Sequence, residues 1–383
     1  MKNIAFFLLL IPFTLTAQKQ VSGRVTDAEN SEPVVGVSVF ISNTSIGTFT
    51  DLDGFYRLTV PEDGSFQLTF SHAGYKLVSK SIMPGNTPIS FNVALQIHEL
   101  QGVTVTANVR FRQTDINLFW KTILGESPSK KKIWVVNPET VFYFYNSETR
   151  ILRVTCREPL QIVNYETGYQ IHYVLDYFTH DYKTGITDWS NQTAFTELKP
   201  ENINQQIKWE KKRREVYNIS LAKFIKSLYN NSLYEDGFVL AGFNKFSSAN
   251  NPYQITLLNP DSILSSKSAD NSKTLNLSQK QLILLCYGRP VTTDDLHNIQ
   301  YASKKVLTSG LLANLLQGDS IHIFPNGTFA NKLQMAPVNG SDVLLSLNRK
   351  LPFEYRSEEI RFIEGLTSDG RIIRQVEKMQ IEK

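Results

Sequence analysis

Cysteine is scarce in this chain, whose 383 residues include only Cys156 and Cys286. A disulfide framework of the kind that stabilises small secreted domains is therefore excluded. The two cysteines lie far apart in the sequence, which gives no local reason to expect a bond between them. We predict two buried free thiols in strands, with one long-range disulfide as the alternative.

An excess of one charge is also lacking. The chain has 40 basic and 36 acidic residues, a formal net charge of +4. This balance excludes the strong basic character that phosphate-backbone binding requires, so no nucleic-acid partner is expected. With 41% hydrophobic residues, the chain is long enough for two or three domains that each have a core.

Long hydrophobic runs are missing except at the N-terminus. Lys2 precedes an apolar run from Ile4 to Leu15, and a cleavage site follows Ala17, which together predict a signal peptide over residues 1–17. The run is shorter than the roughly 20 residues of a spanning helix. No cysteine follows the cut, so we expect an exported protein of the periplasm or outer membrane, without a transmembrane segment and not a lipoprotein.

Catalytic templates are incomplete. The S-x-x-K at 127–130 and the K-T-G at 183–185 imitate a penicillin-binding enzyme, but no S-D-N lies between them. The G-D-S at 318–320 imitates a lipase nucleophile block, yet a strand-like segment follows it, where a helix should begin. No glycine-rich phosphate loop is present. We therefore predict no catalytic residue and no cofactor.

The stretch TDLDGFYRL, residues 50–58, begins like a calcium loop. In the frame from Asp51, however, Phe55 and Tyr56 occupy the positions that need an oxygen ligand and a glycine. We interpret it as a turn, in which an aspartate accepts backbone hydrogen bonds and Gly54 takes a positive φ.

Short alternating apolar runs follow one another from residue 20 to about 108, the pattern of an all-β sandwich. The stretches VSGRVTDAENSEPVVGVSVFISNTSIGTFTDLDGFYRLTV, FSHAGYKLVSKSI and ELQGVTVTAN resemble the carboxypeptidase-regulatory-like domain. The resemblance implies a seven-stranded transthyretin-like sandwich, which many TonB-dependent receptors carry at the N-terminus. It implies no active site, because in true carboxypeptidases this domain is an accessory. No histidine of this chain has a carboxylate three positions later, as a zinc carboxypeptidase would need.

The remainder, residues 109–383, is predicted to be a strand-rich α+β region with a further subdivision near 245–280. Hairpins are expected around residues 146–149 and 183–185, and a helix after Ser220. His172, Asp176 and His180 share one predicted strand face, but each step of four residues spans about 13 Å, too far for one metal ion. No metal site is predicted. Residues 110–245 resemble the uncharacterised C-terminal region of secreted proteins that also carry the regulatory-like domain.

One candidate interaction surface lies in the basic segment IKWEKKRREVYN, where Trp209 and Arg213 are one helical turn apart and Arg214 follows. A solvated helix face and a membrane-binding patch are the alternatives for this segment. The overall prediction is a mainly β protein with an α+β region that acts as a non-catalytic binding or scaffold component of the cell envelope. The alternative is a hydrolase or transferase acting on envelope glycan or peptide, with Tyr169, Tyr173, Tyr177 and Trp189 lining a groove.

Overall fold

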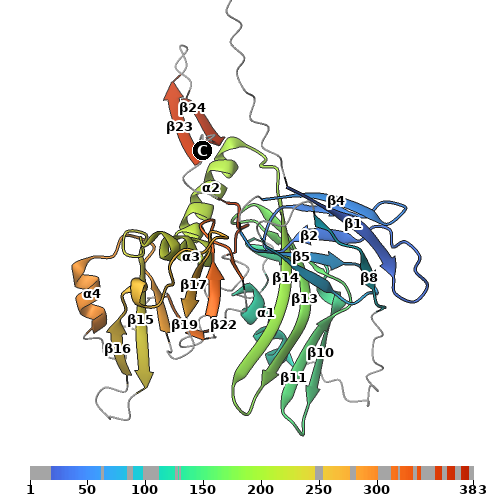
Figure 1. Cartoon of the computed structure of the whole chain (residues 1–383), viewed down its shortest axis with the longest axis horizontal. Helices are drawn as coiled ribbons and strands as arrows, with labels where there is room; N and C mark the ends of the chain where they lie inside the picture. The colour runs from blue at the N-terminus through green and yellow to red at the C-terminus, as the bar shows by residue number, and fades with distance from the viewer. Residues whose placement is uncertain are drawn as a thin grey trace, which may run out of the picture.

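The computed structural model describes residues 19–61, 64–83, 89–97, 112–125, 128, 131–245, 253–276, 282–300, 312–317, 320–330, 334–337, 350–355, 360–366 and 372–378. They form strand-rich modules that each surround a hydrophobic core of their own. We call them the sandwich, the middle module and the third module, in chain order (Figure 1). The mainly β architecture with an α+β region is as predicted.

The sandwich is built from two antiparallel-rich sheets. Its strands are β1 (Lys19–Asp27), β2 (Ser38–Ile41), β3 (Gly47–Phe49), β4 (Phe55–Val60), β5 (Phe66–Ser71), β6 (Val78–Ile82), β7 (Ile89–Ser90) and β8 (Val93–Leu95). One sheet has the order β4-β1-β7 with β8 also on β1, and the other has the order β3-β2-β5-β6. Because β7 and β8 both run parallel to β1 and only residues 91–92 separate them, they fill one strand position, and the sandwich keeps the seven positions that were predicted.

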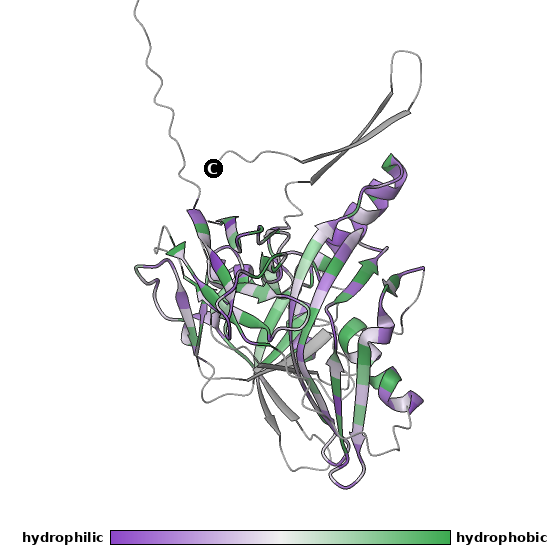
Figure 2. Cartoon of the chain, turned by 90° about the vertical axis from the view of Figure 1, so that its right-hand side faces the viewer, coloured by the Kyte–Doolittle hydropathy of each residue, from purple (hydrophilic) through white to green (hydrophobic). Residues whose placement is uncertain are grey.

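Alternation decides which side chains enter the sandwich core. Along β4 exposed and buried residues alternate strictly, as a strand with one face on a core requires. Val37, Val39 and Ile41, which follow one another at a period of two, are fully buried. Val35 is the exception, because it precedes Gly36, whose positive φ turns the chain before β2 begins. Figure 2 shows the same alternation of hydrophobic and hydrophilic residues along the strands.

The stretch TDLDGFYRL forms the turn that was predicted. The Asp51 carboxylate accepts hydrogen bonds from the backbone N–H groups of Asp53, at 3.0 Å, and Phe55, at 2.8 Å. Gly54 has a φ of 77°. The residues that suggested a calcium loop therefore serve to bring the chain into β4.

The middle module is a curved sheet with a helix across one face. Its elements are α1 (Gln113–Leu124), β9 (Ile133–Val135), the 3₁₀ turn η1 (Pro138–Thr140), β10 (Val141–Asn146), β11 (Ile151–Cys156), β12 (Leu160–Asn164), β13 (Tyr169–Asp181), β14 (Ile186–Glu197) and α2 (Ile203–Tyr217). The sheet order is β10-β11-β13-β12-β9, and β14 pairs along the other edge of β13. Both predicted hairpins, β10–β11 and β13–β14, are present.

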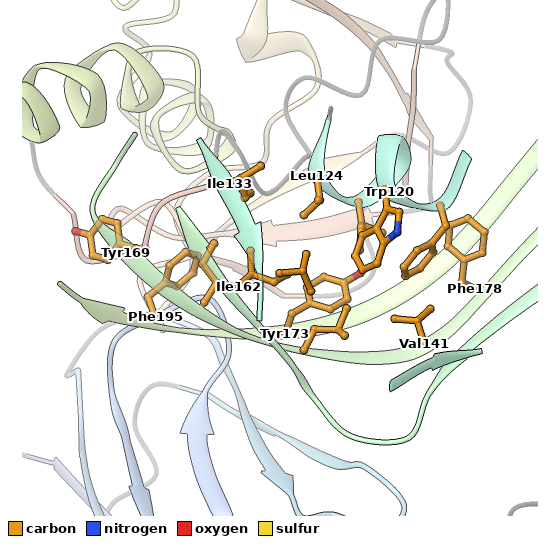
Figure 3. Close-up of a cluster of buried hydrophobic side chains, with 14 of the residues drawn as sticks. Trp120, Leu124, Ile133, Val141, Ile162, Tyr169, Tyr173, Phe178 and Phe195 are labelled. Atoms are coloured by element: carbon orange, nitrogen blue, oxygen red, sulfur yellow. The ribbon is translucent and has the colours of Figure 1, made fainter. Parts of the chain in front are cut away.

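The core of the middle module lies between this sheet and α1 (Figure 3). Phe119 and Ile123 of α1 pack on Ile162, Tyr173 and other residues of the strands. Two residues from much later in the chain, Leu351 and Tyr355, complete the same core. The helical spacing of the apolar residues in α1 thus meets the two-residue alternation of the sheet, which is the ordinary way to bury both surfaces.

A β-bulge in β13 changes which face its residues take. Tyr169, Ile171 and Tyr173 face the core, but the register with β14 shifts between Leu175 and Tyr177. After the bulge Phe178 is in the core. The prediction that Tyr177 shares one face with Tyr169 and Tyr173 is wrong, because one extra residue in β13 reverses the alternation.

The third module begins directly after α2. Its elements are α3 (Leu221–Asn230), β15 (Phe238–Lys245), β16 (Tyr253–Leu257), the 3₁₀ turn η2 (Pro260–Ser262), β17 (Lys273–Asn276), β18 (Leu282–Cys286), α4 (Thr293–Gln300), β19 (Leu312–Gln317), β20 (Ser320–Ile323), β21 (Phe329–Ala330) and β22 (Gln334–Pro337). A five-stranded sheet, β16-β15-β18-β19-β22, and a three-stranded sheet, β17-β20-β21, share the core with α3. As predicted, Ser220 caps α3 by accepting from the N–H of Lys223. A last hairpin, β23 (Ile360–Leu366) with β24 (Ile372–Lys378), follows.

The hydrophobic cores change between α2 and α3. Tyr217 belongs to the core of the middle module, whereas Ile219 packs on that of the third module. The expected subdivision near residues 245–280 instead lies inside the third module, because β15 and β18 pair across it. Between Leu258 and Ser272, the described part of this polar, serine-rich segment forms turns and loops within one module.

Candidate interaction surface

The predicted interaction residues Trp209 and Arg213 are buried against the turn between β12 and β13. The Asn164 side chain stabilises this turn by accepting from the N–H groups of Glu166 and Thr167. Gly168, with a φ of 68°, completes it. The Trp209 indole N–H donates to the carbonyl of Tyr165 at 2.8 Å. Trp209 therefore fixes α2 to the sheet and does not face solvent.

Arg213 is a buried cation that forms ion pairs with the buried Glu210 and with the exposed Glu197. Its guanidinium donates to the carboxylates of Glu197 and Glu210, both at 2.6 Å, and to the carbonyl of Thr167 at 2.6 Å. It also stacks over the Tyr169 ring, 4.2 Å from the centroid. Burial raises the pKa of Glu210, and the ion pair with Arg213 opposes this shift. Arg213 thus holds α2 against the sheet. Of the three residues predicted to form a surface, only Arg214 is partly exposed.

A second polar cluster ties the start of α1 to the hairpin tips. Arg112 forms a two-point ion pair with Asp115, at 2.9 and 2.6 Å, and its guanidinium lies 3.6 Å from the centroid of the Tyr145 ring. The Tyr182 hydroxyl donates to the same carboxylate at 2.5 Å. Burial alone would raise the pKa of Asp115, but these hydrogen bonds hold it below its ordinary value. The carboxylate is therefore occupied by internal contacts.

The three candidate metal ligands on β13 do not come together. His172 faces the sandwich, where its ring packs edge-on against the Phe40 ring, with 5.9 Å between the two ring centroids. His180 follows the bulge and bonds Thr187 at 2.8 Å, beside Tyr182. The bulge separates the two histidines onto different faces. Within the described ranges, no group of three or more His, Cys, Asp or Glu side chains could hold a metal ion.

His172 predicts a pH dependence of stability. Its Nδ1 contacts Gln161 at 2.8 Å, while Nε2 is buried and has no partner among the described residues. Burial lowers its pKa below the ordinary value of about 6.5. The unfolded chain then binds the proton more readily, so this contribution to stability is present above about pH 6.5 and is lost as pH falls toward the folded-state pKa.

We expect His172→Gln to reduce the difference between urea midpoints measured at pH 7.5 and 5.5. Other groups, His180 among them, titrate in both proteins and cancel in the comparison. An unchanged difference would contradict the assignment to His172.

Backbone contacts join the sandwich to the middle module. The N–H of Asn43 donates to the carbonyl of Thr193 at 2.6 Å, and the N–H of Phe195 donates to the carbonyl of Thr44 at 2.9 Å. The Thr193 hydroxyl also donates to the Asn43 side chain at 2.8 Å. The N–H of Phe353 donates to the Asn43 carbonyl at 2.8 Å. The sandwich is therefore fixed on β14 and on the segment that returns to the middle core.

The tip of the β20–β21 hairpin joins the sandwich to the third module. Residues 325–327 form this turn, and Gly327 has a φ of 87°. The Thr328 hydroxyl accepts from the N–H of Ser65 in the sandwich at 3.1 Å. A Cβ on Gly327 would lie 2.5 Å from the carbonyl oxygen of Ala222 in α3. The sandwich thus contacts both other modules.

The predicted aromatic groove is not formed. Tyr169 and Tyr173 belong to the middle core, and Trp189 packs on it. Tyr177 lies on the opposite face after the bulge, where its hydroxyl donates to Asp188 at 3.1 Å. The expectation is wrong because Tyr169 and Tyr173 point into the core, whereas the bulge turns Tyr177 to the opposite face of the sheet.

Exposed apolar side chains instead gather around the turn that resembles a calcium loop. Phe49 is 68% exposed, Leu52 81% and Phe55 52%. Val35, 44% exposed, belongs with them, because Gly36 and Val37 bond the backbone of Thr50. We call these residues the apolar patch. Sequence reasoning treated this stretch only as a turn, although its apolar residues flank and occupy the turn itself.

The cysteines are free, as predicted. Cys156 lies in β11 and Cys286 in β18, which belong to different sheets. Burial raises the pKa of Cys156 to about 12, and it raises that of Cys286 as well. Both thiols are therefore neutral near pH 7 and are poor nucleophiles.

Comparison with known proteins identifies the N-terminal part. Residues 21–105 match the family model described as CarboxypepD_reg-like domain. The sandwich is therefore a carboxypeptidase-regulatory-like domain, as the resemblance implied. The family model does not extend to the middle and third modules.

Two receptors of Formosa agariphila are similar to part of the chain. TonB-dependent receptor P3 is 33% identical over 120 residues, which are 30% of this chain and 12% of the receptor. TonB-dependent receptor P39 is 30% identical over 119 residues, which are 30% of this chain and 11% of the receptor. The matched part thus spans about one eighth of the length of these relatives.

Solved structures add little. A type II cohesin–X-dockerin complex from Acetivibrio cellulolyticus has 16% sequence identity and a TM-score of 0.18, covering 20% of this chain and 52% of that chain. Such a TM-score supports no statement about function. Among the described residues, none of the helices is both long and apolar enough to cross a membrane.

Proposed function

We propose that this protein is an exported, non-catalytic component of the cell envelope that binds another envelope protein and acts as a scaffold. The matched N-terminal domain supports this role, because the relatives that share it are TonB-dependent receptors. The predicted signal peptide supports export. The module contacts through Asn43 and Thr328 support a scaffold, because they hold the sandwich in a fixed place relative to the rest.

The apolar patch is the observation that carries the binding role. Contiguous exposed apolar residues are a feature of interaction sites in soluble proteins. Phe49, Leu52 and Phe55 have large side chains that are exposed and are not part of the sandwich core. Arg24 lies over the Phe55 ring, 5.3 Å from its centroid, and gives the patch a polar border. This composition favours a protein partner that buries apolar side chains of its own.

The test is a cross-linked pull-down from the native envelope with the full chain. We expect one defined protein to be recovered by the natural sequence and lost by the variant Phe49→Ser, Leu52→Ser and Phe55→Ser. Val136→Ser is the matched control, because Val136 is also 52% exposed but lies outside the patch.

Equal recovery by the patch variant and the control would contradict the binding role of the patch. A turnover of envelope glycan or peptide that survives purification and disappears on one point mutation would contradict the non-catalytic role.

A further inference from the structure

Strand β14 has one edge that already forms backbone hydrogen bonds with a turn of the sandwich, in which Asn43 has a φ of 64°. The backbone of Asn43 and Thr44 pairs with Thr193 and Phe195 on this edge, and Thr44 forms a parallel bridge with Ala194. Since Thr193 and Phe195 direct their backbone groups to the sandwich, these groups point away from β13. The edge is therefore competent for strand pairing, and the sandwich occupies only its C-terminal end.

The same edge continues toward the start of β14. Backbone groups alternate between the two edges of a strand, so those of Thr187, Trp189 and Asn191 point the same way as those of Thr193. The bulge does not disturb this alternation, because its extra residue is in β13. In the part of the chain that the structure describes, no backbone group bonds these three residues on that edge. Residues 186–191 offer about 20 Å of strand.

We propose that the edge of β14 from Ile186 to Asn191 pairs with an extended segment of a partner polypeptide. Addition of a strand to an open edge is a general mode of peptide recognition, in which backbone hydrogen bonds supply affinity and alternate side chains supply specificity. The pairing continues the one that Asn43 and Thr44 begin. This site is separate from the apolar patch, and it does not require the proposed function to be correct.

The side chains of β14 define the chemistry of the partner strand. Asp188 is exposed on the face that carries Tyr177, so the partner strand should present basic residues there. Trp189 packs on the middle core from the other face, and Ile186 is 65% exposed at the end of the strand. A segment that alternates basic and apolar residues fits both faces.

Hydrogen exchange and peptide titration test the proposal on the full chain. The probe is a seven-residue peptide of alternating lysine and valine, blocked at both ends. We expect the amides of Trp189 and Asn191 to exchange rapidly in the free protein and to be protected with the peptide. The same peptide N-methylated at alternate residues should bind at least about tenfold more weakly, because it lacks the donors.

Substitutions in β14 provide a second, independent test of the proposal. Thr187→Pro removes an N–H that points to the open edge but leaves the ladder with β13, and proline is tolerated at such positions. Thr187→Ala is the matched control, because it keeps the N–H. We expect Thr187→Pro to weaken peptide binding about tenfold and Thr187→Ala to change it less than twofold.

Three outcomes would overturn the proposal: slow exchange of Trp189 and Asn191 in the free protein, equal binding of the N-methylated peptide, or dimerisation that Thr187→Pro abolishes. The comparison with the N-methylated peptide uses the natural protein, so it tests the proposal even if Thr187→Pro fails to fold. If the patch variant loses the envelope partner but binds the peptide normally, the apolar patch and the β14 edge act independently, and the proposal for β14 is supported.

Discussion

Substitution of Arg213 by Met is expected to destabilise the protein by about 3–5 kcal/mol, because it leaves Glu210 buried without its cation. The side chains of Arg213 and Glu210 are only 3% and 6% exposed, so solvent cannot compensate for the lost partner. Urea denaturation at pH 7 measures the effect as a lower midpoint with an unchanged slope. Arg214→Met is the matched control one position along α2, and its cost should stay within about 1 kcal/mol.

A double variant separates the ion pair from packing. Glu210→Leu in the Arg213→Met background removes the uncompensated carboxylate, and we expect much of the lost stability to return. Equal stability of Arg213→Met and the natural protein, or no recovery in the double variant, would contradict the description of Arg213 as the partner of a buried charge.

Substitution of Gly168 by Ala is the second change with a large expected effect. Its φ of 68° is strained for any other residue, and a Cβ would lie 2.3 Å from the Trp209 ring. The ring cannot easily retreat, because its N–H is bound to Tyr165. We expect a cost of about 1–2 kcal/mol for the backbone and about 1–3 kcal/mol for the overlap.

Gly185→Ala is the matched control. Gly185 has a φ of 74°, but nothing lies within 4 Å of its added Cβ. It should therefore show only the backbone cost in urea denaturation. In a Trp209→Ala background, Gly168→Ala should cost no more than Gly185→Ala does. A cost for Gly168→Ala that is equal to the control in the natural background would contradict the close packing of Trp209.

Local patterns predicted much of the fold. The hairpin turns at residues 146–149 and 183–185, the cap at Ser220 and the Asp51 turn depend on residues close in sequence, and all are present. Apolar residues are adjacent at Tyr173–Leu175 and at Tyr177–Phe178, but this pattern alone does not predict the bulge in β13. Its presence depends on pairing with β14, which is tertiary information.

The candidate surface was predicted less well. The burial of Trp209 and Arg213 depends on Gly168, Glu197 and Thr167, which are distant in sequence and give no local signal. Arginine and tryptophan, which favour anion binding when they lie at a surface, can equally form buried contacts that hold a helix to a sheet. The apolar patch could have been predicted from the sequence, since Phe49, Leu52 and Phe55 surround a turn, where large apolar residues are unusual.

The return of Leu351 and Tyr355 to the middle core has a consequence for folding. The middle module is non-contiguous: the third module is inserted within it, between Tyr217 and Leu351. Contacts of such long sequence separation close a large loop and slow folding. The middle core stays incomplete until Tyr355 has been synthesised, so a chain that emerges N-terminus first must keep Phe119 and its neighbours partly uncovered until that point.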